Sequence, residues 1–189
     1  IVKDGRINRS KTTLNKIVAA TISLLRKNNN GQIPTAQEIA VKSGVGIRTV
    51  FRHIDDMEGL IEEVNRRYLN DLESYIAKNN PKQNSKDQRI EHVIKERFYL
   101  YNTYQHVFNL TITSLNNSSA IRTGFIKFNH ILRQRFEDLI PEIKMINKDK
   151  QNLIDTLISY AAWFRMTKFN NTKEELSLIH ISEPTRLRS

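Results

Sequence analysis

The sequence predicts an all-α protein with a small N-terminal helical head and a larger C-terminal helical body. Three observations support this prediction. Apolar residues recur at helical spacing through most of the chain, residues suited to capping a helix precede several of these stretches, and glycine and proline are scarce, with six and four among 189 residues. Because glycine and proline interrupt helices, their scarcity favours long helical segments.

The first helix is expected from about residue 12. Its apolar face is formed by Leu14, Ile17, Val18, Thr21, Leu24 and Leu25, which follow the three-and-four spacing of an amphipathic helix. Thr12 or Thr13 is a suitable cap, and the asparagine-rich stretch 28–31 should end the helix. Residues 1–11 are basic and polar and show no helical period, so we expect a flexible arm there.

The stretch 35–60 has the most specific pattern in the chain. Thr35 followed by Glu38 predicts a capping box, in which each side chain satisfies a backbone N–H of the other residue. Gly44 should end the helix that begins there, because glycine readily adopts the left-handed conformation of a helix stop. The pattern predicts a short helix followed by a tight turn.

A second short helix should open at Gly46, with Val50 and Ile54 on its inward face. The residues on its outer face are Ile47, Arg48, Thr49, Phe51, Arg52 and His53. Two helices joined by a three-residue glycine turn, with a basic and exposed second helix, are typical of a helix-turn-helix that enters the DNA major groove.

The positive charge of the chain is concentrated in the same region. The net charge is +10, and residues 1–56 contribute +6 of it, with ten Lys or Arg against four Asp or Glu. A basic surface neutralises phosphates and releases counterions, although Lys and Arg also simply solvate protein surfaces. Combined with the helix-turn-helix pattern, the charge favours double-stranded DNA as the partner.

The body should begin with a helix capped by Asp56 and running to about residue 78. The polar, proline-containing stretch 79–85 should separate it from the next helix, for which Ser85 is a suitable cap. A further helix is expected over 104–115, although residues 111–113 alone would also suit a strand. Another helix should follow it and end at Pro141.

A helix expected over about 150–167 is apolar nearly all round, so both of its sides must be covered. It is either a central core helix of a monomer or part of a contact with a second chain, and we favour the second interpretation. The candidate homodimer residues are Leu153, Ile154, Leu157, Ile158, Ala161 and Ala162. Thr172 and Glu175 should then cap a last helix. Residues 181–189 lack any period and are expected to be a non-native tail.

Aromatic residues with interleaved polar ones should converge in the body. This pattern fits a packed core, and it also fits an apolar pocket with a few polar groups for a small-molecule effector, whose identity the sequence does not give. The candidate pocket residues are Phe98, Tyr101, Asn102, His106, Phe125, Phe128, Asn129 and Trp163.

Taken together, residues 12–62 resemble the TetR family of bacterial transcriptional repressors. The matching positions are Ile17, Ala19-Ala20, Leu24-Leu25, Thr35, Ile39-Ala40, Gly44-Val45-Gly46, Thr49-Val50-Phe51, His53, Glu58 and Leu60. The resemblance implies a DNA-binding domain over 12–60 and a regulatory and dimerisation domain over 61–180. It also implies a homodimer joined by its last two helices and a ligand cavity among the central helices.

The same resemblance implies roles for residues of the head. Thr35 and His53 would contact phosphates, Gly46 would allow close approach to the DNA backbone, and bases would be faced by Ile47, Arg48, Thr49 and Arg52. Two positions depart from the family pattern: Phe51 stands where Tyr is frequent, and Met57 where Lys is frequent. These departures, with the neighbouring Asp55-Asp56, keep open an alternative in which a TetR-like fold acts through a protein partner.

Several other functions find no support in the sequence. The chain has no cysteine, which excludes disulfides and thiolate chemistry, and no apolar run long enough to span a membrane. None of its five histidines lies three or four positions from another, and no phosphate loop or paired-carboxylate motif is present. We therefore expect a cytoplasmic protein that is not an enzyme and needs no cofactor.

Overall fold

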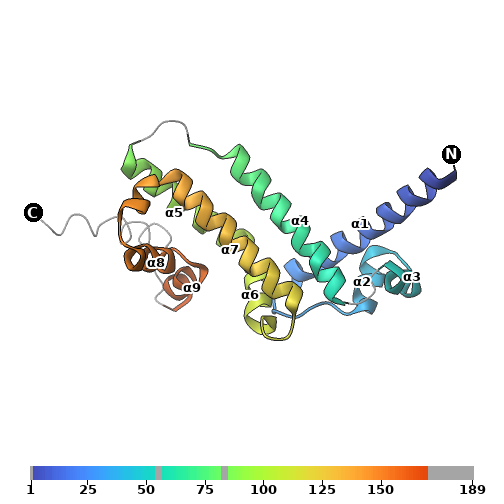
Figure 1. Cartoon of the computed structure of the whole chain (residues 1–189). Coiled ribbons are helices and arrows are strands. Elements are labelled where there is room, and N and C mark those ends of the chain that lie inside the picture. Colours follow the sequence, from blue (N-terminus) through green and yellow to red (C-terminus); the bar gives the residue numbers. More distant parts are fainter. Residues whose placement is uncertain (1, 54–56, 82–84, 170–189) are drawn as a thin grey trace, which may run out of the picture. The chain divides into compact units, whose positions relative to one another are not determined.

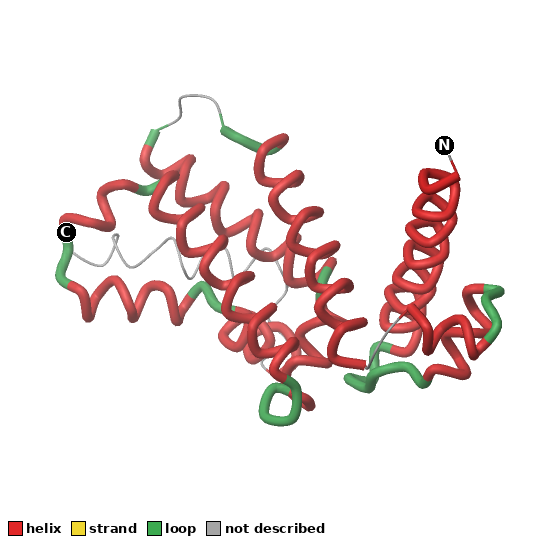
Figure 2. Tube along the Cα trace, turned by 45° about the vertical axis from the view of Figure 1, so that its right-hand side comes forward, coloured by secondary structure: helices red, strands yellow, loops and turns green. Residues whose placement is uncertain are grey.

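The computed structural model describes residues 2–53, 57–81 and 85–169, and these ranges are helical with short connections and contain no strand (Figure 2). The all-α fold class is therefore confirmed for the described residues. The helices of Figure 1 are α1 (Val2–Asn28), α2 (Ala36–Ser43), α3 (Ile47–His53), α4 (Met57–Lys78), α5 (Lys86–Thr103), α6 (Gln105–Ser114), α7 (Ser119–Leu139), α8 (Lys148–Leu157) and α9 (Tyr160–Phe164). A 3-10 helix covers Pro141–Met145, and a π-helix covers Arg165–Phe169.

The chain forms two compact units, and each combines segments that are distant in sequence. The first contains Ile1–Glu73 and Gln105–Phe128, and the second contains Ser74–Tyr104 and Asn129–Ser189. These units differ from the expected division near residue 60, because α6 and the start of α7 belong with the N-terminal helices.

The N-terminal helix is longer than expected. α1 begins at Val2, so residues 2–11 of the flexible arm expected over 1–11 are corrected to a helix. Thr12 and Thr13 lie inside it, and their hydroxyls donate to the carbonyl oxygens of Asn8 and Arg9 at 2.8 and 2.9 Å. The apolar period starts late because residues 7–12 are exposed. Once the packed part of the helix exists, each added residue gains a hydrogen bond at little further entropy cost.

In the first unit α1 packs against α2, α3 and α6, and α4 contributes buried side chains to the core. Its fully buried described side chains are Ile17, Thr21, Ile39, Val50, Leu60, Ile61 and Leu72. Thr21, the polar member, donates its hydroxyl hydrogen to the carbonyl oxygen of Ile17 at 2.9 Å. Because Ile39 and Val50 are buried at the contacts among α1, α2 and α3, they fix both short helices against the long one.

A carboxylate on α4 caps the N-terminus of α7. Glu58 Oε2 accepts hydrogen bonds from Ser119 Oγ at 2.8 Å and from the backbone N–H of Ala120 at 2.9 Å. Hydrogen bonds from Ser118, Ala120 and Ser119 lower the pKa of Glu58. Two turns along α4, Asn65 Nδ2 donates to the carbonyl oxygen of Ala120 at 2.8 Å. These bonds tie the first part of α7 to α4.

The turn between α1 and α2 is held against α6. Asn109 Nδ2 donates to the backbone and side-chain oxygens of Asn29 at 3.2 and 2.9 Å, and the Thr113 hydroxyl donates to the carbonyl oxygen of Gly31. Gly31 has φ +72°, and a Cβ atom there would lie 2.8 Å from the Asn109 carbonyl oxygen. Both the left-handed backbone and the close approach of α6 therefore require glycine at this position.

In the second unit, Ser85 and Gln88 form a capping box at the start of α5, which confirms Ser85 as the expected cap. The core beside this helix consists of Val93, Phe136, Leu139, Ile140, Ile143 and Ile158. An ion pair is buried in the same unit: two guanidinium nitrogens of Arg135 lie 3.2 Å from the two carboxylate oxygens of Glu96. The Arg135 guanidinium also donates to oxygens of Asn79 and Asn80.

The helix expected over 150–167 is interrupted. α8 ends at Leu157, and α9 begins after Ser159. The Ser159 hydroxyl accepts from the backbone N–H of Ala162 at 3.4 Å and donates to the carbonyl oxygen of Thr156 at 2.7 Å. A serine hydroxyl can replace helical backbone hydrogen bonds in this way, and the helical period of the apolar residues did not reveal it.

Several expected features lie outside the described residues. They are the inward-facing Ile54, the cap at Asp56, the last helix beginning near Thr172 and Glu175, and the tail 181–189.

Candidate functional site

The candidate site is the exposed side of α3, and the α2–turn–α3 segment positions it. The capping box expected at the start of α2 is present: the Thr35 hydroxyl accepts from the backbone N–H of Glu38 at 3.3 Å, and the Thr35 backbone N–H donates to Glu38 Oε2 at 2.8 Å. The Thr35 hydroxyl donates to the same oxygen, also at 2.8 Å. These bonds lower the pKa of Glu38.

This geometry bears on the phosphate contact expected of Thr35. A phosphate oxygen accepts hydrogen bonds, so the contact needs a donor from the protein. The backbone N–H and the hydroxyl hydrogen of Thr35 are both directed to Glu38 in this structure. The residue is exposed, but its described donors serve the cap.

Two glycines shape the turn between α2 and α3. Gly44 has φ +67° and ψ +20°, the left-handed conformation expected at the end of α2. The carbonyl oxygen of Gly46 accepts from the N–H groups of Thr49 and Val50 at 2.7 and 3.1 Å, which starts α3. A Cβ atom on Gly46 would meet nothing within 4 Å, so this side of the turn is open.

The residues of α3 divide cleanly between its two sides. Val50 is fully buried, whereas Ile47 and Phe51 are 38% and 59% exposed. Arg48 and Arg52 are exposed as well, and Thr49 and His53 are half-buried. The structure thus places both arginines on the outer side of α3, as the sequence analysis expects.

Within the described residues, the outer side of α3 carries positive charge and no acidic side chain. No described hydrogen bond or ion pair joins Arg48 or Arg52 to another side chain. α3 contains no acidic residue, and Lys42 adds an exposed positive charge in the last turn of α2. Two guanidinium groups, each with donors in a rigid fork, therefore face outward and are available to an acceptor.

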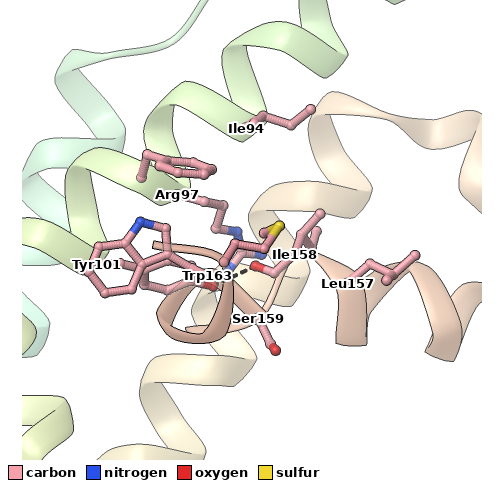
Figure 3. A pocket seen from close by; sticks show the side chains of 9 residues that line it. Ile94, Arg97, Tyr101, Leu157, Ile158, Ser159 and Trp163 are labelled. Carbon is pink, nitrogen blue, oxygen red and sulfur yellow. Dashed lines mark hydrogen bonds between the residues drawn. The ribbon is translucent and has the colours of Figure 1, made fainter. Parts of the chain in front are cut away.

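The eight residues expected to form one ligand pocket do not line a single cavity: five line two small cavities, His106 is buried beside one of them, and two are exposed. Phe98, Tyr101 and Trp163 line a cavity in the second unit, between α5 and α9 (Figure 3). The Tyr101 hydroxyl donates to the carbonyl oxygen of Ile158 at 2.7 Å. Trp163 Nε1 is buried and has no hydrogen-bond acceptor among the described atoms. The free space is about 10 Å³, close to the least that holds one water.

A second cavity lies in the first unit, among α4, α6 and α7. Phe125 and Phe128 line it together with Tyr68, whose hydroxyl lies 2.8 Å from His106 Nε2. Burial, and to a smaller extent the charge of Arg26, lowers the pKa of His106 to about 4. The imidazole is therefore neutral at neutral pH. The free space is about 30 Å³.

α4 also contributes to this second cavity, although none of its residues was expected in a pocket. Asn65, Tyr68 and Leu69 line it from one side of that helix. Their three-and-four spacing, which puts them on one face of the helix, is the signal in the sequence. Asn102 and Asn129 are exposed and line neither cavity.

The candidate homodimer residues have mixed positions. Leu153 and Leu157 on α8 are 59% and 51% exposed, and Ala161 is exposed. Ile158 instead lies in the core of its own unit, with Ile154 packed against that core. Ala162 is half-buried. The helix break after Leu157 separates these residues, so they do not form one continuous stripe.

The described ranges hold no further candidate metal site or membrane span. No cluster of histidine, aspartate or glutamate is placed to hold a metal ion there. No described helix is both long and apolar enough to cross a membrane. Comparison of the sequence with protein-family models and with curated proteins finds no match.

Proposed function

We propose that this protein is a DNA-binding transcriptional regulator whose α2–turn–α3 segment is a helix-turn-helix. The observation that supports this most directly is the outer side of α3, where Arg48 and Arg52 are exposed opposite the buried Val50. Arginine is the side chain best suited to bidentate hydrogen bonding with guanine in the major groove. The fixed glycine turn presents these groups on a helix whose inner side is already packed.

The proposal includes repression by a homodimer on a pseudo-palindromic operator, with release by a small-molecule effector. Leu153 and Leu157 on α8 are exposed apolar side chains that a second copy would cover. Two heads would then meet successive major grooves about 34–36 Å apart. An effector would favour release only through its higher affinity for a conformation that does not bind DNA. Because both described cavities are small, the conformation that binds the effector must open one of them.

The test begins with DNA selected from a random pool by the purified protein. Arg52→Ala should weaken binding to the selected sequence by about 1–3 kcal/mol, and binding to random DNA should change much less. Lys127→Ala is the matched control, because it removes one positive charge from an exposed position on α7. Affinity should also fall steeply with salt for every variant.

Two results would count against the proposal. Equal losses on selected and random DNA would show that Arg52 contacts phosphate and reads no base. Absence of binding to double-stranded DNA even at low salt would remove the DNA-binding function altogether. It would then favour the second candidate, a regulator of the same fold that acts through a protein partner.

One observation favours that second candidate. Phe51 is 59% exposed and Val41 on α2 is 75% exposed, and large exposed apolar side chains are frequent in protein contacts. Affinity capture with the wild-type protein and a Phe51→Ser variant distinguishes the two functions. The protein-partner function requires a partner that the variant no longer binds.

A further inference from the structure

The exposed side of α3 carries two neighbouring rows of side chains. Ile47 and Phe51 are four residues apart and form an apolar row, while Arg48 and Arg52, also four apart, form a guanidinium row. Residues four apart on a helix lie on the same face, and a step of one residue turns by about 100°. The two rows therefore run side by side along the outer side of the helix.

The apolar row is only partly covered by the described residues. Val50 is fully buried and attaches α3 to the core, while Ile47 and Phe51 stay 38% and 59% exposed. Covering an exposed aromatic ring with an apolar group lowers the free energy, because apolar surface is removed from water. The exposed part of this row is therefore available to an apolar group of a binding partner.

The neighbouring charges indicate which partner covers this row. Arg48 and Arg52 flank it, α3 has no acidic residue, and neither arginine is engaged by a described side chain. The partner must therefore offer acceptors and apolar groups within a few ångströms of each other. In the DNA major groove, guanine offers two acceptors to arginine, and the C5-methyl of thymine is the apolar group on a base edge.

On the basis of the proposed DNA-binding function, we propose that Ile47 and Phe51 read thymine through its C5-methyl group. The guanidinium row reads guanine in the same half-site. Successive Cα atoms are about 3.8 Å apart and successive base pairs about 3.4 Å. The thymines that matter therefore lie within one or two base pairs of the guanine.

The proposal is tested by replacing thymines of the selected DNA, one at a time, with deoxyuridine. This substitution removes the methyl group and leaves every hydrogen bond of the base pair in place. For the wild-type protein, one or two positions in each half-site should lose about fourfold in affinity, the amount expected from one buried methyl-sized group. The remaining positions should be unaffected.

Variants assign the effect to the apolar row. Phe51→Ala or Ile47→Ala should bind the thymine and uracil forms equally at the position that each side chain contacts. Phe51→Leu keeps an apolar contact and should keep most of the difference. Arg52→Ala should retain the uracil effect while losing preference for guanine. Because these side chains are exposed, circular dichroism and thermal unfolding should match the wild type.

The outcomes separate this inference from the function on which it rests. Sequence-selective binding that ignores every thymine-to-uracil change would overturn methyl recognition and leave the DNA-binding function intact. A uracil effect that persists unchanged in both alanine variants would overturn the assignment to Ile47 and Phe51. If no double-stranded DNA is bound at any salt concentration, both proposals fail and the apolar row belongs to a protein contact.

Discussion

Replacing Gly31 with alanine should destabilise the protein by about 2–5 kcal/mol. An L residue in the left-handed conformation costs roughly 1–2 kcal/mol, and Gly31 has φ +72°. The added Cβ would also lie 2.8 Å from the carbonyl oxygen of Asn109 and 2.9 Å from Thr113 Cγ2. The oxygen belongs to the backbone of α6 and cannot turn away, so overpacking adds about 1–3 kcal/mol.

Two other glycines provide matched controls. Gly44 has nearly the same backbone conformation, with φ +67°, but a Cβ there would meet nothing within 4 Å. Gly44→Ala should therefore cost only the conformational part, about 1–2 kcal/mol. A Cβ on Gly46 would also meet nothing, and no left-handed φ strains it, so Gly46→Ala should leave stability nearly unchanged. If Gly46 lets the backbone approach DNA, that variant should still bind DNA more weakly.

Urea unfolding followed by far-UV circular dichroism measures all three variants against the wild type. The expected order of destabilisation is Gly31 first, then Gly44, then Gly46. A Gly31→Ala variant as stable as Gly44→Ala would refute the close contact between the α1–α2 turn and α6.

Two further predictions concern buried charged or titratable groups. His106 is neutral in the folded state down to about pH 4, whereas in the unfolded chain its pKa is ordinary, so the unfolded state binds more protons and stability falls as pH falls. The free energy of unfolding of the wild type should fall by about 2 kcal/mol between pH 7.5 and pH 5, and that of His106→Gln should change little for this reason. Urea unfolding at both pH values measures this. Equal losses in the two proteins would contradict the prediction. Glu96→Ala should cost about 3–5 kcal/mol because it leaves the Arg135 guanidinium buried without its counter-charge. The double variant Glu96→Leu with Arg135→Met should recover much of that loss in the same assay, and a double variant no better than the single one would show that the charge is not the cause.

The α2–turn–α3 segment was predictable because its determinants are local. The Thr35–Glu38 capping box spans four residues, and the left-handed conformation of Gly44 follows from glycine itself. The outward position of Arg48 and Arg52 follows from helix geometry once Val50 is placed in the core. None of these inferences needs information about distant parts of the chain.

Features that depend on distant contacts were missed or placed incorrectly. The α8–α9 break depends on Ser159 bonding to the backbone while Ile158 turns into a core formed with α5 and α7, and apolar spacing alone does not show this. The candidate pocket failed to appear as one cavity because its aromatic residues pack in two separate clusters. Which aromatic rings meet depends on side-chain volumes across several helices, and one sequence does not specify them.

The helical start of α1 limits how far its charges reach. Ten residues of extended chain span at most about 33–36 Å, whereas ten helical residues span about 15 Å. The exposed Arg9 and Lys11 therefore lie on a rigid helix at a fixed separation. They cannot follow a DNA groove as residues of an extended, flexible segment could. If these two residues contact DNA, they reach only phosphates that lie close to the helix. The stretch of DNA contacted by the first turns of α1 is then short, and the direction of the helix axis determines its position.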